Sequence, residues 1–402
     1  MSIPVPQSEI HRFPIQPVHR FKGTSARIKK PKEITHFSFD DEHKYVYDDS
    51  GIKYYVPPPI GVDLKEGFDT FKHYEDKEDT HLDALLKALV DKERQHGETA
   101  RAKADFVTWR GMMTKIMTAP FDNFAEFAMF ATLYDGTIYI EEDFPSRAAE
   151  CAAERENQPP PRYHQHPDQQ SRDMMTYWGY KFETLALIPT PPSTTHPADI
   201  EKHQRSCVSN HAQHCSIVGT AFGPHSLILG GEVDGLLVAH KPKPKPTDAE
   251  ADAEAEEASI PWVELKTAEE LPPPNRQQHR DILKFERKLL KFWAQSFLLG
   301  VPKIVVGFRS KAGILRGVQT LHTHELPGMV RKGTNCWDGN VCINFATAVL
   351  AWLKDIVTEE CVYRLVLRKK SGVIEVQKIK EGTGGIVSDE FLAWRRQRQR
   401  QS

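Results

Sequence analysis

Apolar residues recur three and four positions apart in several long stretches of the chain, which is the spacing of one face of an α-helix. This pattern predicts helical structure from about residue 80 to 132 and a second helix from about Arg172 to Leu187. A third and stronger helix is predicted from about Gln278 to Leu299, because an apolar stripe faces a lysine-rich stripe and Gly300 supplies a typical helix stop. The polar stripe of this helix is typical of a solvated face.

Shorter apolar runs predict strands between these helices. Thr137 to Glu141 reads as a strand, and Ile304 to Arg309 reads as a buried strand of the kind that runs parallel to an earlier one. Residues 1 to about 60 are rich in proline and contain paired tyrosines, so short strands on the domain surface are expected there. The order of helices and strands indicates an α+β or α/β fold with a mixed β-sheet core flanked by helices.

Three segments lack the residues that build a core. Residues 146–170 are polar and contain Pro159, Pro160 and Pro161, so a surface loop is predicted. Residues 241–258 join Lys-Pro repeats to an Asp/Glu/Ala run and are expected to be a disordered insert within a hairpin. We therefore expect one domain over residues 1–390 and a basic tail over 391–402, which would serve as a nuclear localisation or RNA-contact segment or would be a solvated helix end.

Composition limits the classes of protein to consider. The chain has 402 residues, of which 39% are hydrophobic and 27% charged, and a formal net charge of -2, so any nucleic-acid contact must rest on a local basic patch. No apolar stretch approaches the roughly 18 residues needed to cross a bilayer. The first residues do not resemble a signal peptide, so the cytosol or nucleus is expected, with the six cysteines reduced.

Two acidic clusters carry the candidate chemistry. Glu232 and Asp234 open one apolar run, and Glu264 and Lys266 follow an apolar pair about thirty residues later. Alternate residues of a strand share a face, so pairing of the two strands would bring three carboxylates and an ammonium together. Such carboxylates repel one another unless a divalent cation neutralises them or their pKa values rise. The alternative is a set of solvated strand residues, which the apolar context disfavours.

An acid followed by Glu-x-Lys is the skeleton of the metal-dependent PD-(D/E)XK nucleases, and further motifs narrow the resemblance. Six motifs stand in the order and approximate spacing of one family, and these are Arg110 in Thr108-Trp-Arg-Gly111, Gly179-Tyr-Lys-Phe-Glu183, Gly231-Glu-Val-Asp234, Glu264-Leu-Lys266, Lys291-Phe-Trp-Ala-Gln295 and Gly307-Phe-Arg309. They resemble the DXO/Rai family of RNA 5′-end decapping nucleases over about residues 106–309. In lacking an N-terminal extension and in its basic C-terminal end, the chain most resembles the fungal nuclear Rai branch.

The resemblance implies roles for individual residues. Two Mg²⁺ or Mn²⁺ ions would be held by four acids and one carbonyl, namely Glu183, Glu232, Asp234, Glu264 and the carbonyl of Leu265. Lys266 and Gln295 would flank the scissile phosphate or its nucleophilic water. Arg110 and Lys291 would contact substrate phosphates, and Arg309 would either bind substrate or only anchor the end of the sheet.

The resemblance also implies a function. The substrate would be the 5′ end of RNA, with pyrophosphate released from triphosphate ends and incomplete or nicotinamide-type caps removed, in support of a nuclear 5′-to-3′ exoribonuclease. Two alternatives stay open: a mainly non-catalytic stabiliser of that exoribonuclease, and a DNA endonuclease on the same core. The His/Cys cluster of His203, Cys207, His211, His214 and Cys215 has tolerable zinc spacing but matches no standard finger, so a polar loop is favoured.

Overall fold

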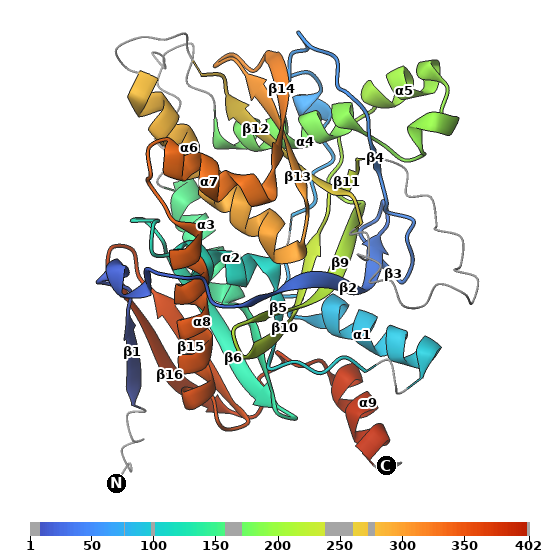
Figure 1. Ribbon diagram of the computed structural model, residues 1–402. Coiled ribbons are helices and arrows are strands. Elements are labelled where there is room, and N and C mark those ends of the chain that lie inside the picture. Colours follow the sequence, from blue (N-terminus) through green and yellow to red (C-terminus); the bar gives the residue numbers. More distant parts are fainter. Residues whose placement is uncertain are drawn as a thin grey trace, which may run out of the picture.

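Two mixed β-sheets and the helices packed on them make up the structure, a computed structural model shown in Figure 1. It describes residues 9–75, 77–97, 101–156, 171–237, 260–271 and 278–399. The predicted mixed-sheet core with flanking helices is confirmed, although the strands divide into a ten-stranded and a six-stranded sheet.

The larger sheet has the strand order β1-β16-β15-β6-β7-β5-β10-β9-β2-β3. Its strands are β1 (Ile10–Pro14), β2 (Ile28–Phe39), β3 (Tyr45–Val46), β5 (Phe106–Trp109), β6 (Phe127–Tyr134), β7 (Thr137–Glu142), β9 (Gln213–Phe222), β10 (His225–Glu232), β15 (Cys361–Leu367) and β16 (Val373–Glu381). Strand β5 runs parallel to both β7 and β10, while the other neighbours are antiparallel. The sheet is therefore mixed around β5.

The smaller sheet has the order β14-β13-β12-β11-β4-β8. Its strands are β4 (Tyr54–Tyr55), β8 (Leu187–Ile188), β11 (Gly235–Leu236), β12 (Trp262–Glu269), β13 (Lys303–Arg309) and β14 (Leu315–His322). Strands β11 and β12 pair antiparallel, as predicted for the hairpin that carries the insert. Strand β13 pairs parallel to β12 from Val263 to Glu269, which confirms the prediction of a parallel strand.

Helices cover the sheets and fill the space between them. They are α1 (Asp83–His96), α2 (Arg110–Thr118), α3 (Phe144–Glu156), α4 (Arg172–Ala186), α5 (Pro197–Gln204), α6 (Gln278–Leu299), α7 (Leu326–Lys332), α8 (Gly339–Ile356) and α9 (Asp389–Gln399), with short 3-10 turns at Val18–Phe21, Phe68–Thr70, Pro192–Thr194 and Thr323–Glu325. The largest core cluster joins buried side chains of α2, α6 and α8 to side chains of both sheets. In Figure 1 the helices α6, α2 and α8 lie in the same region, next to strands of each sheet.

The helices predicted at Arg172–Leu187 and Gln278–Leu299 are present as α4 and α6. Gly300 follows α6 with a φ of 72°, a left-handed conformation that glycine adopts without strain. The prediction of continuous helical structure over 80–132 is wrong, because β5 and β6 lie within it. Apolar residues occupy both faces of these strands, although the burial of β6 alternates, so their sequences carry little period-two alternation and look helical.

The loop predicted over 146–170 is also wrong in its first part, since residues up to 156 belong to α3. Residues 157–170 and the predicted disordered insert at 241–258 lie outside the described residues. The short strands predicted near the N-terminus are present as β3 and β4, but the same region also holds the twelve-residue strand β2.

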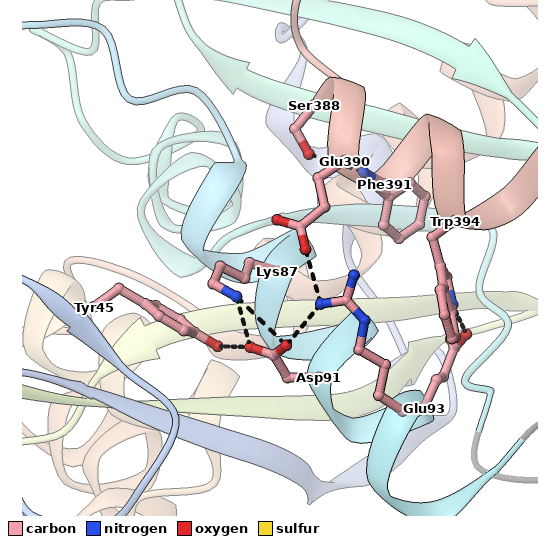
Figure 2. A network of polar contacts seen from close by, with 9 residues as sticks. Tyr45, Lys87, Asp91, Glu93, Ser388, Glu390, Phe391 and Trp394 are labelled. Atoms are coloured by element: carbon pink, nitrogen blue, oxygen red, sulfur yellow. Dashed lines mark hydrogen bonds and ion pairs between the residues drawn. The ribbon is translucent and has the colours of Figure 1, made fainter.

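The C-terminal helix α9 packs against α1. Phe391 and Arg395 are buried, and Arg395 donates two hydrogen bonds to Glu93 of α1, at 2.6 and 2.8 Å. Figure 2 shows the neighbouring contacts, in which Trp394 donates to Glu93 and Asp91 accepts from Tyr45 and Lys87. Residues 391–399 thus pack on the rest of the chain through specific side chains. Across the described ranges, no helix has both the length and the apolar character that a membrane crossing requires.

Candidate active site

The candidate site lies where the chain passes from one sheet to the other. Strand β10 ends at Glu232, and β11 of the smaller sheet begins at Gly235, so Asp234 sits in the two-residue link. The N–H of Val233 donates to the carbonyl of His214 at 3.0 Å and fixes this link. Glu232 and Asp234 were predicted to share one face of one strand, whereas the structure divides them between the end of a strand and a connection.

Glu264 is the centre of the charged cluster. Its side chain on β12 is only 1% exposed, and its two oxygens are held by different cations. Lys266 Nζ lies 2.6 Å from Oε1, and Arg110 Nη1 lies 3.2 Å from Oε2. Burial opposes ionisation of Glu264, but these two cations outweigh burial and hold its pKa below the usual value. Glu264 is therefore an ionised carboxylate inside the protein.

Lys266 and Arg110 reach Glu264 from different elements. Lys266 lies two residues further along β12, and Arg110 is the first residue of α2, directly after β5. Burial would discharge the ammonium of Lys266, yet Glu264 and Asp234 together raise its pKa. Lys266 remains charged and keeps a quarter of its side chain exposed, so it can reach a bound substrate.

Asp234 is held by the backbone of the same strand. The N–H of Leu265 donates to its Oδ2 at 2.5 Å. Burial and the neighbouring charge of Glu264 raise the pKa of Asp234 to about 7. Leu265 itself is buried and pairs with Val305 of β13, so its backbone position is fixed by the sheet.

Glu183 and Glu232 complete the acidic set. Glu183 lies on α4, and burial together with the charges of Asp234 and Glu232 raises its pKa well above the usual value. Burial also raises the pKa of Glu232, against the opposing influence of Lys53 and Arg110. The charges of Glu232, Asp234 and Glu264 disfavour ionisation of other acids in the set, so the four predicted acids are electrostatic neighbours, although no three of them bring ligand atoms within 4.8 Å of one another.

Lys53 is a residue of this neighbourhood that the sequence did not reveal. It precedes β4, its carbonyl accepts from the N–H of Leu236 in β11 at 2.8 Å, and its ammonium donates to the carbonyl of Ala212 at 3.2 Å. Its charge lowers the pKa of both Glu183 and Glu232. A single lysine in an N-terminal segment gives no motif, so only the pairing of β4 with β11 could identify it.

Gly231 brings the two helices α2 and α6 onto the site. A Cβ at this position would lie 3.0 Å from side-chain atoms of Arg110 and Leu299, so glycine lets both helices approach the end of β10 without crowding. Gln295, which was predicted to flank the scissile phosphate, is half-buried one turn before Leu299 on α6. The structure thus places Gln295 on the helix that borders the acidic cluster.

Two predicted substrate contacts, Lys291 and Arg309, have other partners in the structure. Lys291 is 62% exposed and lies 3.0 Å from Asp122 Oδ2, in the loop after α2. The guanidinium of Arg309 lies 4.1 Å from the ring centroid of Trp178, and its Nη1 donates to the carbonyl of Ser310. Arg309 therefore contacts α4 and Ser310, the next residue of the chain, and both roles expected for it stay predictions.

The His/Cys cluster of residues 203–215 does not assemble. His203 lies on α5, exposed Cys207 donates to the carbonyl of Thr70, and His214 and Cys215 are adjacent in β9, where neighbouring side chains face opposite sides. In the described part of the chain, the only group of three His, Cys, Asp or Glu side chains whose ligand atoms all lie within 4.8 Å is Asp79, His81 and Glu141. His81 and Glu141 are already hydrogen-bonded to each other, at 3.0 Å.

The acids around Glu264 fit a divalent cation by their chemistry. They offer carboxylate oxygens, the ligands that Mg²⁺, Mn²⁺ and Ca²⁺ prefer. Burial and mutual repulsion raise their pKa values, although Lys53, Arg110 and Lys266 act in the opposite direction, and a bound cation would relieve the repulsion that remains. Glu183, Glu232, Asp234 and Glu264 are thus the residues that would hold such an ion.

Comparison with known proteins agrees with this geometry. The model of the RAI1-like PD-(D/E)XK nuclease family matches residues 29–392. The chain belongs to this family. It is 46% identical to the decapping nuclease RAI1 of Emericella nidulans over 385 residues, which cover 95% of this chain and 98% of the relative. The expected resemblance to the fungal Rai branch is confirmed.

Solved structures of the RAI1-like family have the same fold. Candida albicans Rai1, solved in complex with pU5-Mn2+, superimposes with a TM-score of 0.81 at 27% identity and covers 97% of this chain and 99% of its own. Scheffersomyces stipitis Rai1, in complex with (3'-NADP)+ and calcium ion, gives a TM-score of 0.78 at 27% identity, with 93% of this chain and 97% of its own covered.

Proposed function

We propose that this protein is a divalent-metal-dependent hydrolase of RNA 5′ ends. The observation that carries the proposal is the arrangement around Glu264. The ionised carboxylate of Glu264 forms ion pairs with Arg110 and Lys266, and it lies beside three acids whose pKa values are raised. A structural ion pair does not require three further acids whose charges repel its carboxylate. This arrangement therefore favours a metal-assisted reaction on an anionic substrate.

Each charged residue has a task that follows from its position. Lys266 is charged, partly exposed and anchored at 2.6 Å to Glu264, so its ammonium can stabilise negative charge that develops on a phosphate or can orient a water molecule. Arg110 donates to Glu264 through one guanidinium nitrogen, and its other N–H groups can donate to a phosphate oxygen. Lys53, directly before β4, adds positive charge near Glu183 and Glu232.

The acids would hold the metal. Glu183, Glu232, Asp234 and Glu264 converge from α4, β10, the link before β11 and β12, with Leu265 providing a carbonyl of fixed position. A bound divalent ion supplies Lewis-acid activation of water and charge compensation at the phosphate. The chemistry that we propose is direct hydrolysis: water attacks phosphorus and one phosphorus–oxygen bond is broken.

The substrate class comes from the relatives. The curated relatives are named decapping nucleases, one solved neighbour holds the RNA fragment pU5, and another holds a nicotinamide dinucleotide. These names support RNA 5′ ends, including nicotinamide-type caps, as the substrate class. We propose triphosphate ends and incompletely methylated caps as further members of that class. Hydrolysis of a triphosphate end would yield pyrophosphate and monophosphate RNA.

The test is hydrolysis of 5′-labelled triphosphate RNA by the purified protein with Mg²⁺ or Mn²⁺. We expect pyrophosphate release that chelation stops and that the double variant Glu232→Gln/Asp234→Asn lacks. Glu325→Gln is the matched control, because Glu325 is 64% exposed and remote from the acidic cluster. Intact RNA with every metal would contradict the proposal, and cleavage of duplex DNA in place of RNA would favour the endonuclease alternative.

We also propose a nuclear 5′-to-3′ exoribonuclease as partner, since monophosphate RNA is the product that such an enzyme consumes. A pull-down with wild type and with the Glu232→Gln/Asp234→Asn variant separates this role from catalysis. Binding that survives the double substitution while hydrolysis is lost would show two independent roles. Failure of both proteins to bind the exoribonuclease would contradict the partnership and leave the hydrolase proposal intact. Microscopy of the tagged protein tests the nuclear location.

A further inference from the structure

An exposed aromatic ring in the loop that follows α2 lies beside two lysines. Phe124 is 64% exposed, and the ammonium groups of Lys369 and Lys370 lie 5.7 and 5.9 Å from the centre of its ring. Lys291 of α6 contacts Asp122 in the same loop at 3.0 Å. We call Phe124, Lys369 and Lys370 the distal patch.

The loop holds Phe124 outward by its own hydrogen bonds. Asp122 accepts from the N–H of Phe124 through its side chain at 3.0 Å and from the N–H of Ala125 through its carbonyl at 2.9 Å. The other apolar residues of the loop, Phe121 and Ala125, pack against the main core. Phe124 alone is turned to solvent, in a backbone that the neighbouring bonds keep in place.

The two lysines are available to a ligand. Lys369 and Lys370 are exposed in the turn between β15 and β16, and within the described ranges neither makes an ion pair. Their distances from the ring are near the outer limit for a cation–π contact, so this contact holds them weakly. A single exposed apolar side chain is ordinary on a protein surface. An exposed ring flanked by unpaired ammonium groups is what binds a single-stranded nucleic acid, through base stacking and phosphate contacts.

Helices α2 and α6 connect the distal patch to the acidic cluster. Arg110 at the start of α2 contacts Glu264, and Asp122, four residues after the end of α2, contacts Lys291 of α6. Leu299, at the end of α6, returns to Gly231 beside Arg110. Helix α2 therefore runs from the site toward the distal patch, and the antiparallel helix α6 runs back to the site. Lys291 and Gln295 lie on the stretch of α6 that leads from Asp122 to the site.

The spacing predicts which part of an RNA strand would reach the distal patch. The nine residues of α2 span about 13 to 14 Å at 1.5 Å per residue. A stacked strand rises about 3.4 Å per nucleotide, so roughly four or more nucleotides fit between the site and Phe124. A substrate shorter than this would not touch the ring.

We propose that the distal patch is a second contact for single-stranded RNA, which grips the strand downstream of the 5′ end that is hydrolysed. A base would stack on Phe124, and Lys369 and Lys370 would neutralise neighbouring phosphates. This inference rests on the proposed function in one respect, that the strand is RNA. It makes the enzyme select for RNA with a free single-stranded 5′ segment over free nucleotides.

The experiment compares two lengths of substrate. Steady-state kinetics are measured with a 5′-triphosphate dinucleotide and a 5′-triphosphate 12-mer for wild type, Phe124→Ala and Lys369→Ala/Lys370→Ala. With the 12-mer we expect kcat/KM to fall on the order of tenfold in each variant, mainly through KM. With the dinucleotide we expect no change, because it does not reach the distal patch.

Matched controls and a binding assay complete the design. Ile379→Ala removes another exposed apolar side chain, which is 49% exposed, and Arg331→Ala/Lys332→Ala removes two exposed charges from α7. Fluorescence anisotropy with a 5′-monophosphate 12-mer reports binding without turnover. Loss of two phosphate contacts should reduce the slope of log K against log salt by about 1.4.

The outcomes divide clearly. Equal losses of kcat/KM with the dinucleotide and the 12-mer would overturn the proposal, because they would place the effect in the fold or the active site. Unchanged binding and kinetics with the 12-mer would overturn it as well. If wild type hydrolyses neither substrate but binds the 12-mer through Phe124, the proposed function fails and the distal patch stands. Melting temperatures of all variants confirm that each is folded.

Discussion

Lys266 Nζ lies 2.6 Å from Glu264 Oε1, so the lysine that would assist the reaction is positioned by an acid of the same strand. Removal of its ammonium should cost on the order of 10²–10³-fold in kcat, the loss typical of one preorganised charged donor. We expect Lys266→Ala to show this loss with a small change in KM. Lys380→Ala, which removes an exposed lysine of β16, is the control, and a purely structural role would instead appear as a lower melting temperature with kcat retained.

A divalent ion should stabilise the folded protein. Glu183, Glu232 and Asp234 have raised pKa values from burial and mutual repulsion, and a cation bound to the folded state relieves both. Saturation at a hundredfold excess over the dissociation constant is worth about 2.7 kcal/mol. Differential scanning fluorimetry with Mn²⁺ should therefore show a rise of the melting temperature that EDTA reverses. The same rise in Glu232→Gln/Asp234→Asn would place the ion elsewhere, with Asp79, His81 and Glu141 the next candidates.

Removal of one partner from the buried ion pair between α1 and α9 should strongly destabilise the protein. Arg395→Ala leaves Glu93 buried without its partner, which costs about 3–5 kcal/mol. Replacement of both residues by apolar side chains, as in Glu93→Leu/Arg395→Met, should cost less, because no charge is stranded. Urea unfolding measures both, with the exposed Arg396→Ala as control. Equal losses in the single and double variants would contradict this account.

The free energy of unfolding should fall in acid because of His214. This side chain is 3% exposed, and burial, with the nearby charge of His36, lowers its pKa to about 4, while Glu33, Asp49 and Asp48 act in the opposite direction. The unfolded chain, with a histidine pKa of about 6.5, binds the proton first, so stability is lost as the pH falls from about 6.5 to 4. The expected loss is about 3 kcal/mol.

His214→Asn tests this directly. Asparagine can keep a hydrogen bond to Ser38, which His214 Nδ1 approaches at 3.2 Å, but it does not titrate. We expect the free energies of unfolding of variant and wild type to differ by a constant amount above about pH 6.5. Below that pH the wild type should lose stability relative to the variant. His36, whose pKa is raised by Glu33, is present in both proteins and cancels in the comparison. A constant difference down to pH 4 would rule out His214 as the source.

Local patterns predicted those parts of the fold that local patterns determine. Helix α6 has a long amphipathic period and a glycine stop, so its bounds were predicted closely. Strands β5 and β6 were mistaken for helix because apolar residues occupy both of their faces, so the sequence lacks the alternation that identifies a strand. What covers each face of a strand is a property of the whole fold and leaves little trace in a short segment.

The candidate site shows the same division. The motifs that contain Glu264, Lys266 and Arg110 indicated residues that the structure brings into direct contact. Lys53 could not be predicted, because it joins the cluster through the pairing of β4 with β11 across 180 residues of sequence. Lys291 was expected near the substrate phosphates, and its contact with Asp122 became visible only when α2 and α6 were seen side by side.

The two-residue link between β10 and β11 has a consequence for biosynthesis. Glu232 terminates one sheet and Asp234 precedes the other, so neither sheet alone carries the full set of acids. During synthesis, a chain in which only one sheet has formed would therefore lack part of the acidic set. Hydrolysis that depends on all four acids would begin only after both sheets have folded and docked.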